Sequence, residues 1–163
     1  GGFICGPKAV IKYLRYNTRS QIFAKSMPLM VVEGMLKRMD MIKTMPELRE
    51  KLWYNVNKLQ TGLKERGFDI GGTNSPVTPI FMKGDVPEAT QMVMDLRENY
   101  HIFCSIVVYP VIPKGDIIYR LIPTAAHSDA DIDETLKAFE ETKKKLDAGV
   151  YKAVDIPDMA EAN

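Results

Sequence analysis

An arginine stands inside an otherwise apolar segment of the sequence. The six residues from Ile117 to Ile122 read IIYRLI, a run typical of a buried strand except for Arg120. Alternation along a strand places Arg120 on the same face as Ile118 and Ile122. Because an unpaired guanidinium on a covered face would cost several kcal/mol, Arg120 must either meet an anion or open onto a cleft.

Two interpretations of Arg120 follow from its chemistry. In the structural one, Arg120 forms an internal ion pair, or lies on an edge strand and extends to water. Asp116 is four residues back and shares the face only if the strand stays regular. In the functional one, the planar guanidinium binds a small carboxylate through two parallel hydrogen bonds, which lysine cannot do in the same orientation. The strand pattern alone favours the structural interpretation.

Other residues with reactive side chains do not form a recognised motif. His127 and His101 lack a partnered cysteine, serine or second ligand, so we interpret them as packing or capping residues. Cys5 and Cys104 are far apart and lack metal-binding spacing, so we expect reduced thiols that pack, and no metal site. The glycine-rich loop at residues 71–76, GGTNSP, lacks the lysine and spacing of a P-loop.

The elements that must position Arg120 follow from periodicity and from turn and capping residues. Helical patterns are predicted at residues 7–17, 28–43, 44–67, 87–99 and 128–146. Strand patterns are predicted at residues 77–82, 101–105, 106–110 and 116–122. Thr44 and Glu47 read as a capping box, and Ser128 reads as the cap of the last helix. Residues 19–27 read as irregular.

The order of these elements predicts an α/β (α+β) fold. From residue 68 to residue 146 the order is strand, helix, strand, strand, helix, which indicates a small domain with a largely antiparallel sheet and packed helices. Pro79 suggests that the first strand lies at an edge or contains a bulge. The long helices at residues 28–66 read as a connector.

Composition limits the class of protein. A chain of 163 residues with 45% hydrophobic content can bury a core, and 22 basic against 21 acidic residues give no overall field that favours nucleic acid or an anionic membrane. No apolar run approaches the ~20 residues of a membrane span, so we expect a soluble, intracellular protein. The chain begins GGFICG without methionine, and we expect a fragment.

Several short motifs occur in a fixed order along the chain. They are GGF at residues 1–3, LRYNTRSQIFAKSMP at 14–28, NSPVTPIF at 74–81 and VYPVIPKGDIIYRLIPTAAHSDADID at 108–133. Together they resemble the C-terminal part of the α-oxoamine synthases, which are fold-type I enzymes that use pyridoxal phosphate. This family includes serine palmitoyltransferase, 2-amino-3-ketobutyrate CoA ligase, 8-amino-7-oxononanoate synthase and 5-aminolevulinate synthase. The resemblance extends to about Leu146.

The resemblance implies a function and two sets of site residues. It implies a cytoplasmic, homodimeric acyltransferase that condenses a small amino acid, glycine or serine, with an acyl-CoA. Arg120 matches the arginine that binds the carboxylate of the amino acid. Phe23, Ala24, Lys25 and Ser26 match a segment that crosses to the neighbouring subunit and helps to hold the cofactor phosphate. Relatives often have a hydroxyl residue where this chain has Ala24, which places that particular contact in question.

The resemblance also implies a division of the chain. The lysine that forms the Schiff base precedes GGF in the family, so we expect it to lie before Gly1, and we expect this chain alone to be inactive. Residues 1–27 would end the large pyridoxal phosphate-binding domain, and 28–66 would be connector helices. Residues 67–147 would form the small domain, and 148–163 a C-terminal tail. The alternatives are a stand-alone module that recognises a small carboxylate, and another aminotransferase-like enzyme.

Overall fold

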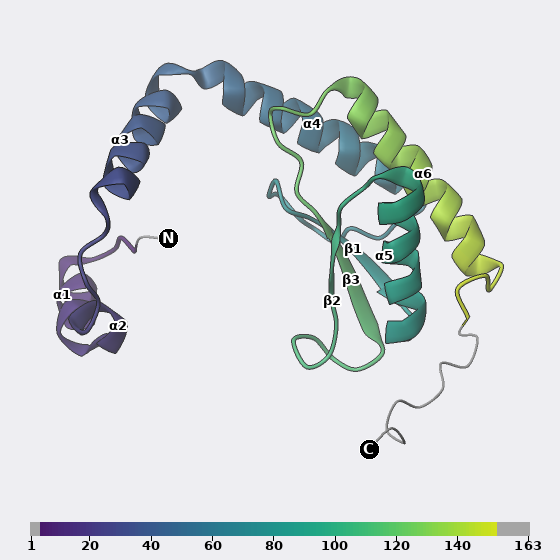
Figure 1. Cartoon of the computed structure of the whole chain (residues 1–163), viewed down its shortest axis with the longest axis horizontal. Helices are drawn as coiled ribbons and strands as arrows, with labels where there is room; N and C mark the ends of the chain where they lie inside the picture. The colour runs from purple at the N-terminus through teal and green to yellow at the C-terminus, as the bar shows by residue number, and fades with distance from the viewer. Residues whose placement is uncertain (1–3, 153–163) are drawn as a thin grey trace. The chain divides into compact units, whose positions relative to one another are not determined.

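The computed structural model describes residues 4–152 (Figure 1), so the GGF motif at 1–3 and most of the predicted tail, 153–163, lie outside the described residues. The chain forms two compact units, which divide between Thr44 and Met45. The first contains the helices α1 (Lys8–Asn17), α2 (Arg19–Ile22) and α3 (Leu29–Thr44). The second contains α4 (Pro46–Glu65), β1 (Thr78–Lys83), α5 (Val86–Tyr100), β2 (Ser105–Val107), β3 (Asp116–Leu121) and α6 (Asp129–Asp147).

The first unit is helical in its described part. Residues 19–27 were expected to be irregular, but 19–22 form one helical turn, in which the N–H groups of Ile22 and Phe23 donate to the carbonyls of Thr18 and Arg19. None of the residues of α1, α2 and α3 is buried within the described chain. The core therefore lies in the second unit.

The start of α4 differs from the predicted one, and the capping box at Thr44 and Glu47 is wrong. Thr44 remains in the last turn of α3, where its hydroxyl donates to the carbonyl of Asp40 at 2.9 Å. Met45 precedes α4 with φ −123° and ψ 66° and makes no side-chain capping bond. The break falls at Met45 because Pro46 disfavours helical backbone in the residue before it.

The second unit contains a three-stranded antiparallel sheet in the order β1-β3-β2, as the element pattern predicts. The predicted edge position of Pro79 is confirmed, since β1 is an edge strand. The two strands predicted at 101–105 and 106–110 are wrong, because only residues 105–107 form a strand. The N–H of Ile102 instead donates to Leu96 at the end of α5, and the N–H of Val111 closes a turn onto Val108.

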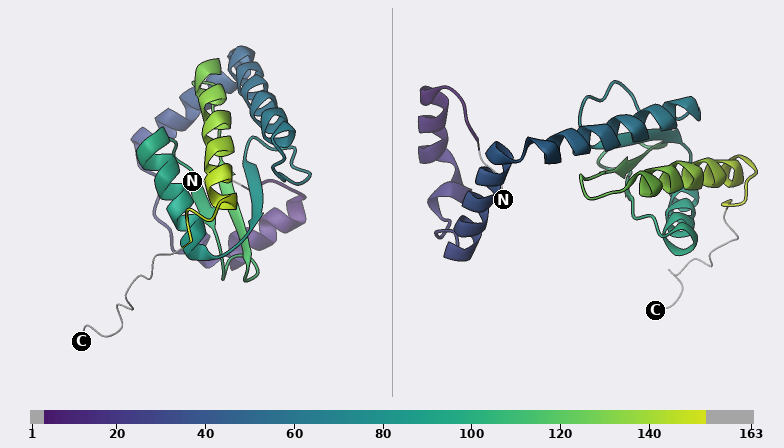
Figure 2. Two further views of the ribbon diagram at one scale, coloured as in Figure 1. Left: turned by 90° about the vertical axis from the view of Figure 1, so that its right-hand side faces the viewer. Right: turned by 90° about the horizontal axis from the view of Figure 1, so that it is seen from above.

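Helices α5 and α6 cover one face of the sheet. The side chains of Ile117, Tyr119 and Leu121 are buried on this face of β3. The rings of Tyr119 and Phe139 meet edge to face with centroids 6.5 Å apart, and the Tyr119 hydroxyl donates to the Ala89 carbonyl at 3.4 Å. Figure 2 shows α6 lying between α5 and α4, and α6 packs against both.

Both ends of α6 are tied to the domain. The predicted cap at Ser128 is confirmed as a capping box, in which the Ser128 hydroxyl accepts from the N–H of Asp131 and the Asp131 carboxylate accepts from the N–H of Ser128. After the helix, Tyr151 is 7% exposed and donates a hydrogen bond to Asp95 on α5. The core thus extends into the segment that the sequence assigns to the tail. No helix within residues 4–152 is long and apolar enough to cross a membrane.

Candidate functional site

The face of the sheet that turns away from α5 and α6 carries Arg120. The cross-strand register pairs Arg120 with Ser105 on β2 and with Pro79 on β1. The next row on this face is apolar and consists of Ile118, Phe81 and Val107. Arg120 is exposed and Phe81 is 42% exposed, whereas Ile118 and Val107 are half-buried. The described residues therefore leave this face partly open to solvent. We call it the open face.

The surroundings of Arg120 separate it from the ion pairs elsewhere in the chain. β3 is the central strand and not an edge strand. The strand is regular from Asp116 onwards, so Asp116 does share the face of Arg120, but its carboxylate pairs with Lys83 on β1. Within residues 4–152, the hydrogen bond of the Arg120 side chain runs from Nε to the Oγ of Ser105 at 3.2 Å. The two Nη groups therefore remain available to a ligand.

A cleft of about 610 Å³ opens beyond the end of β3. Phe103 and Ile122 line it, and each lies two residues beyond the paired positions Ser105 and Arg120. Phe103 is 80% exposed and Ile122 is 56% exposed. Other lining residues are Leu59, Leu121, Ile132, His101, His127 and Glu134. The cleft is therefore formed by the end of α5, the end of β3 and the start of α6, close in sequence to Arg120.

His127 stabilises the turn that follows β3. Its Nδ1 accepts a hydrogen bond from the N–H of Thr124 at 2.9 Å, which agrees with the interpretation of His127 as a capping residue. Asn55 on α4 is fully buried, and its amide donates to the carbonyls of Thr124 and His127 at 2.9 Å each. Sequence reasoning missed Asn55, although an asparagine inside an apolar helical stripe was an available signal. This contact ties α4 to the end of the strand that carries Arg120.

The buried and paired titratable groups of the second unit serve packing. Cys104 is 4% exposed, and burial raises the pKa of its thiol to about 11, so it stays protonated near neutral pH. Hydrogen bonds from Lys51 and Tyr54 lower the pKa of Asp129 and link α4 to α6. Among residues 4–152, no three His, Cys, Asp or Glu side chains are grouped so that they could hold a metal ion.

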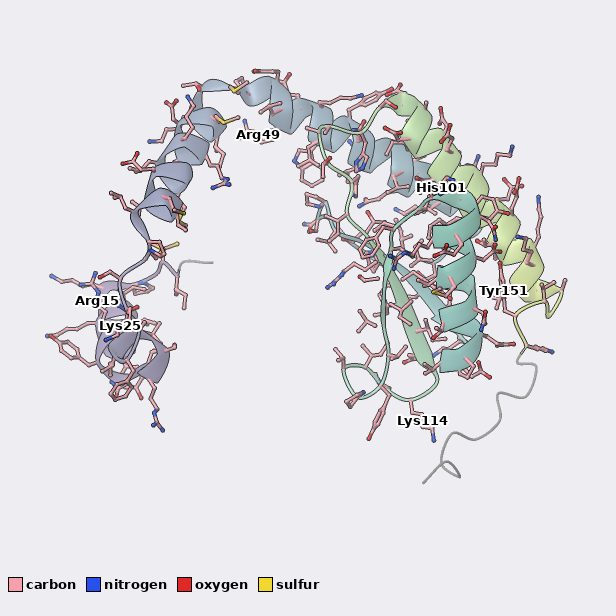
Figure 3. All side chains as sticks on the ribbon, viewed as in Figure 1. Arg15, Lys25, Arg49, His101, Lys114 and Tyr151 are labelled. Atoms are coloured by element: carbon pink, nitrogen blue, oxygen red, sulfur yellow. The ribbon has the colours of Figure 1, made fainter. Side chains whose placement is uncertain are left out.

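The second set of predicted site residues lies in the first unit. Phe23 follows α2 and is 76% exposed, and the segment from Ala24 to Ser26 is exposed and irregular. The ammonium of Lys25 (Figure 3) and the hydroxyl of Ser26 are donors that suit an anionic group such as a phosphate. Ala24 contributes no side-chain donor. These residues and Arg120 belong to different units of the chain.

Comparisons with known proteins identify the family. The model of the aminotransferase class I and II family matches residues 1–139, and the chain belongs to this family. Within it, the relatives are α-oxoamine synthases, which confirms the resemblance seen in the motifs. The chain is 61% identical to cysteate-C-fatty acyltransferase of Capnocytophaga ochracea over 95% of its own length, and 36% identical to 8-amino-7-oxononanoate synthase of Petrotoga mobilis over 90%.

A solved structure supports the same assignment for the fold. Serine palmitoyltransferase from S. paucimobilis, with PLP and myriocin bound, superimposes with a TM-score of 0.73 and 27% identity over 84% of this chain and 34% of that one. The predicted fold, the small domain of a fold-type I enzyme, is confirmed. The chain spans 37% of the length of each of the two relatives named above.

Proposed function

We propose that this chain is part of a pyridoxal phosphate-dependent acyltransferase that condenses an amino acid with a fatty acyl thioester. In this proposal Arg120 binds the carboxylate of the amino acid. The observation that carries it is the guanidinium fork on the open face, whose two Nη groups have no hydrogen-bond partner among residues 4–152, in a chain that belongs to the aminotransferase class I and II family. A planar fork with two unused Nη groups suits a carboxylate, which accepts two parallel hydrogen bonds.

The position of Arg120 gives it a role in orientation. When bound, pyridoxal phosphate supplies an electron sink for the negative charge that develops at the α-carbon of the amino acid. Two hydrogen bonds from one rigid fork would fix the rotation of the carboxylate and, with it, the α-carbon. Arg120 would thereby determine which bond of that carbon is presented for cleavage. A lysine would supply charge at the same place but not this orientation.

The residues of the first unit fit a supporting role toward the cofactor phosphate. Lys25 would contribute charge, and Ser26 and the nearby backbone N–H groups would contribute hydrogen bonds. Ala24 cannot provide the hydroxyl that relatives often have at its position, and Phe23 would pack rather than bind. We propose that this segment acts on the neighbouring subunit of a homodimer, while the large domain binds most of the cofactor.

The choice of amino acid is best drawn from the most similar relative named above. At 61% identity that relative is a cysteate-C-fatty acyltransferase, whereas the 8-amino-7-oxononanoate synthase is 36% identical. We therefore propose cysteate as the first candidate substrate, with serine and glycine as alternatives. The apolar row formed by Phe81, Ile118 and Val107 would suit the start of a fatty acyl chain beside the carboxylate site.

We further propose how the residues of this chain are divided among the domains of the intact protein. Residues 1–27 would complete the large domain, 28–66 would connect the domains, 67–147 would form the small domain, and 148–163 would form a tail. Tyr13, Phe23 and Met30 are 66%, 76% and 81% exposed in the described chain, which favours contacts with other parts of a larger cytoplasmic homodimer. This chain by itself would be inactive.

The test uses the intact protein with its cofactor, a fatty acyl-CoA and cysteate, serine or glycine in turn. Condensation breaks the bond from the α-carbon to the carboxylate, forms a carbon–carbon bond to the acyl carbon, and releases carbon dioxide and the free thiol. We expect thiol release and a long-chain amino ketone, fastest with cysteate. Turnover only with serine or glycine would contradict the proposal that cysteate is the substrate. Amino-acid binding without any thiol release would favour the binding module.

A further inference from the structure

We infer that Ser105 is a positioning residue for Arg120, and that it leaves the end-on fork of the guanidinium free for the substrate carboxylate. This inference rests on the proposed function and adds a residue to it. Ser105 acts through Arg120 and is not itself in contact with the reacting atoms.

The cross-strand register makes Ser105 the lateral partner of Arg120. The two residues pair directly between β2 and β3, and Pro79 occupies the corresponding position on β1. The proline side chain has no polar atom, so it cannot hold a guanidinium. The Ser105 hydroxyl can, and its Oγ accepts from the Nε of Arg120 at 3.2 Å. Of its two cross-strand neighbours, only Ser105 on β2 forms a hydrogen bond with the Arg120 side chain.

The donors of arginine explain the consequence of this contact. A guanidinium can grip a carboxylate side-on, through Nε and one Nη, or end-on, through both Nη groups. The bond to Ser105 uses the single N–H of Nε. The side-on mode would have to break that bond, while the end-on mode leaves it intact. Ser105 therefore selects the end-on mode.

The surroundings of Arg120 make such a contact useful. Arginine has a long side chain with many rotamers, and on the open face its neighbours are mainly apolar: Ile118, Phe81 and Val107 in the next row. None of these can fix the direction of the guanidinium. A single hydroxyl that orders the side chain before the substrate arrives reduces the entropy lost on binding.

The experiment compares five variants of the intact protein with its cofactor: Ser105→Ala, Ser105→Thr, Arg120→Ala, the double variant Ser105→Ala with Arg120→Ala, and Thr90→Ala. Thr90→Ala is the matched control, since Thr90 is an exposed hydroxyl residue on α5 whose hydroxyl bonds only to the carbonyl of Val86 in the described chain. The readouts are the dissociation constant of cysteate, from the absorbance of the bound cofactor, and the KM and kcat for each substrate.

We expect Ser105→Ala to weaken cysteate binding about three- to tenfold, the range for one hydrogen bond, with the KM for acyl-CoA unchanged. Ser105→Thr should restore the affinity, and Thr90→Ala should not change it. In the Arg120→Ala background, Ser105→Ala should have no further effect, because its partner is gone.

Three outcomes would overturn the inference. These are an unchanged affinity in Ser105→Ala, a failure of threonine to restore binding, and an equal loss from Ser105→Ala with and without Arg120. Each leaves the proposed function intact as long as Arg120→Ala weakens binding. If Arg120→Ala binds cysteate normally, the proposed role of Arg120 itself fails.

Discussion

Replacing Arg120 with alanine should weaken amino-acid binding with little effect on the cofactor. Because Nε is already bonded to Ser105, the substrate carboxylate would receive two hydrogen bonds from the Nη groups. One hydrogen bond to a charged group contributes roughly 1.5 to 3 kcal/mol. Because Arg120 is exposed, water would replace part of what is lost in the variant, so we expect the two bonds together to contribute about this much rather than twice as much. The dissociation constant of the amino acid should therefore rise roughly 10- to 150-fold.

The assay is a titration of the intact, cofactor-loaded variant with cysteate, serine and glycine, followed by the absorbance of the cofactor. Arg120→Lys provides a matched comparison, since it keeps the charge and removes the fork, and it should fall between arginine and alanine. Cofactor content should remain that of the unmodified protein. Equal affinity of Arg120→Ala and the unmodified protein for all three amino acids would refute the reasoning.

Three further predictions concern stability, each measured by denaturant unfolding of the chain. Gly62→Ala places a Cβ 2.5 Å from the buried Leu136, so the unfolding free energy should fall by about 1–2 kcal/mol despite the better helix propensity of alanine. An increase in the unfolding free energy would contradict the close contact between α4 and α6. Ser128→Ala removes the cap of α6 and should cost about 1 kcal/mol, whereas Ser128→Asp should retain most of the stability. Burial alone would raise the pKa of Asp95, but its hydrogen bonds, led by that from Lys145, lower it. The ionised carboxylate therefore stabilises the fold at pH values above its unfolded pKa of about 3.9. This stabilisation is lost as the pH falls through the lowered pKa of the folded state. In Asp95→Asn, the unfolding free energy should fall less as the pH is lowered. An unchanged pH dependence of the unfolding free energy would contradict this role of Asp95.

The sequence predicts most of the second unit because its elements have clear periods. Alternation around Arg120 places it correctly on one face with Ile118 and opposite Tyr119, and the acidic first turn after Ser128 marks the start of α6. The same reasoning predicts too much strand at residues 101–110, where residues with high strand propensity form the end of a helix and a turn. Propensity cannot foresee that the N–H of Ile102 is used by the end of α5.

Contacts between distant segments were the part that sequence reasoning could not supply. The register that places Ser105 beside Arg120 depends on how β2 and β3 pair, and no local pattern fixes it. The buried Asn55 and the packing of Tyr151 against Asp95 likewise join residues far apart in the sequence. For the same reason, the motifs identify Arg120 as a candidate but not the hydroxyl that orients it.

The most direct test of the account is a crystal structure of the intact protein with its cofactor and cysteate bound. The account predicts both Nη groups of Arg120 at about 2.7–2.9 Å from the two carboxylate oxygens, with Nε still bonded to Ser105. A carboxylate held by another cation, with Arg120 turned away from the ligand, would contradict it.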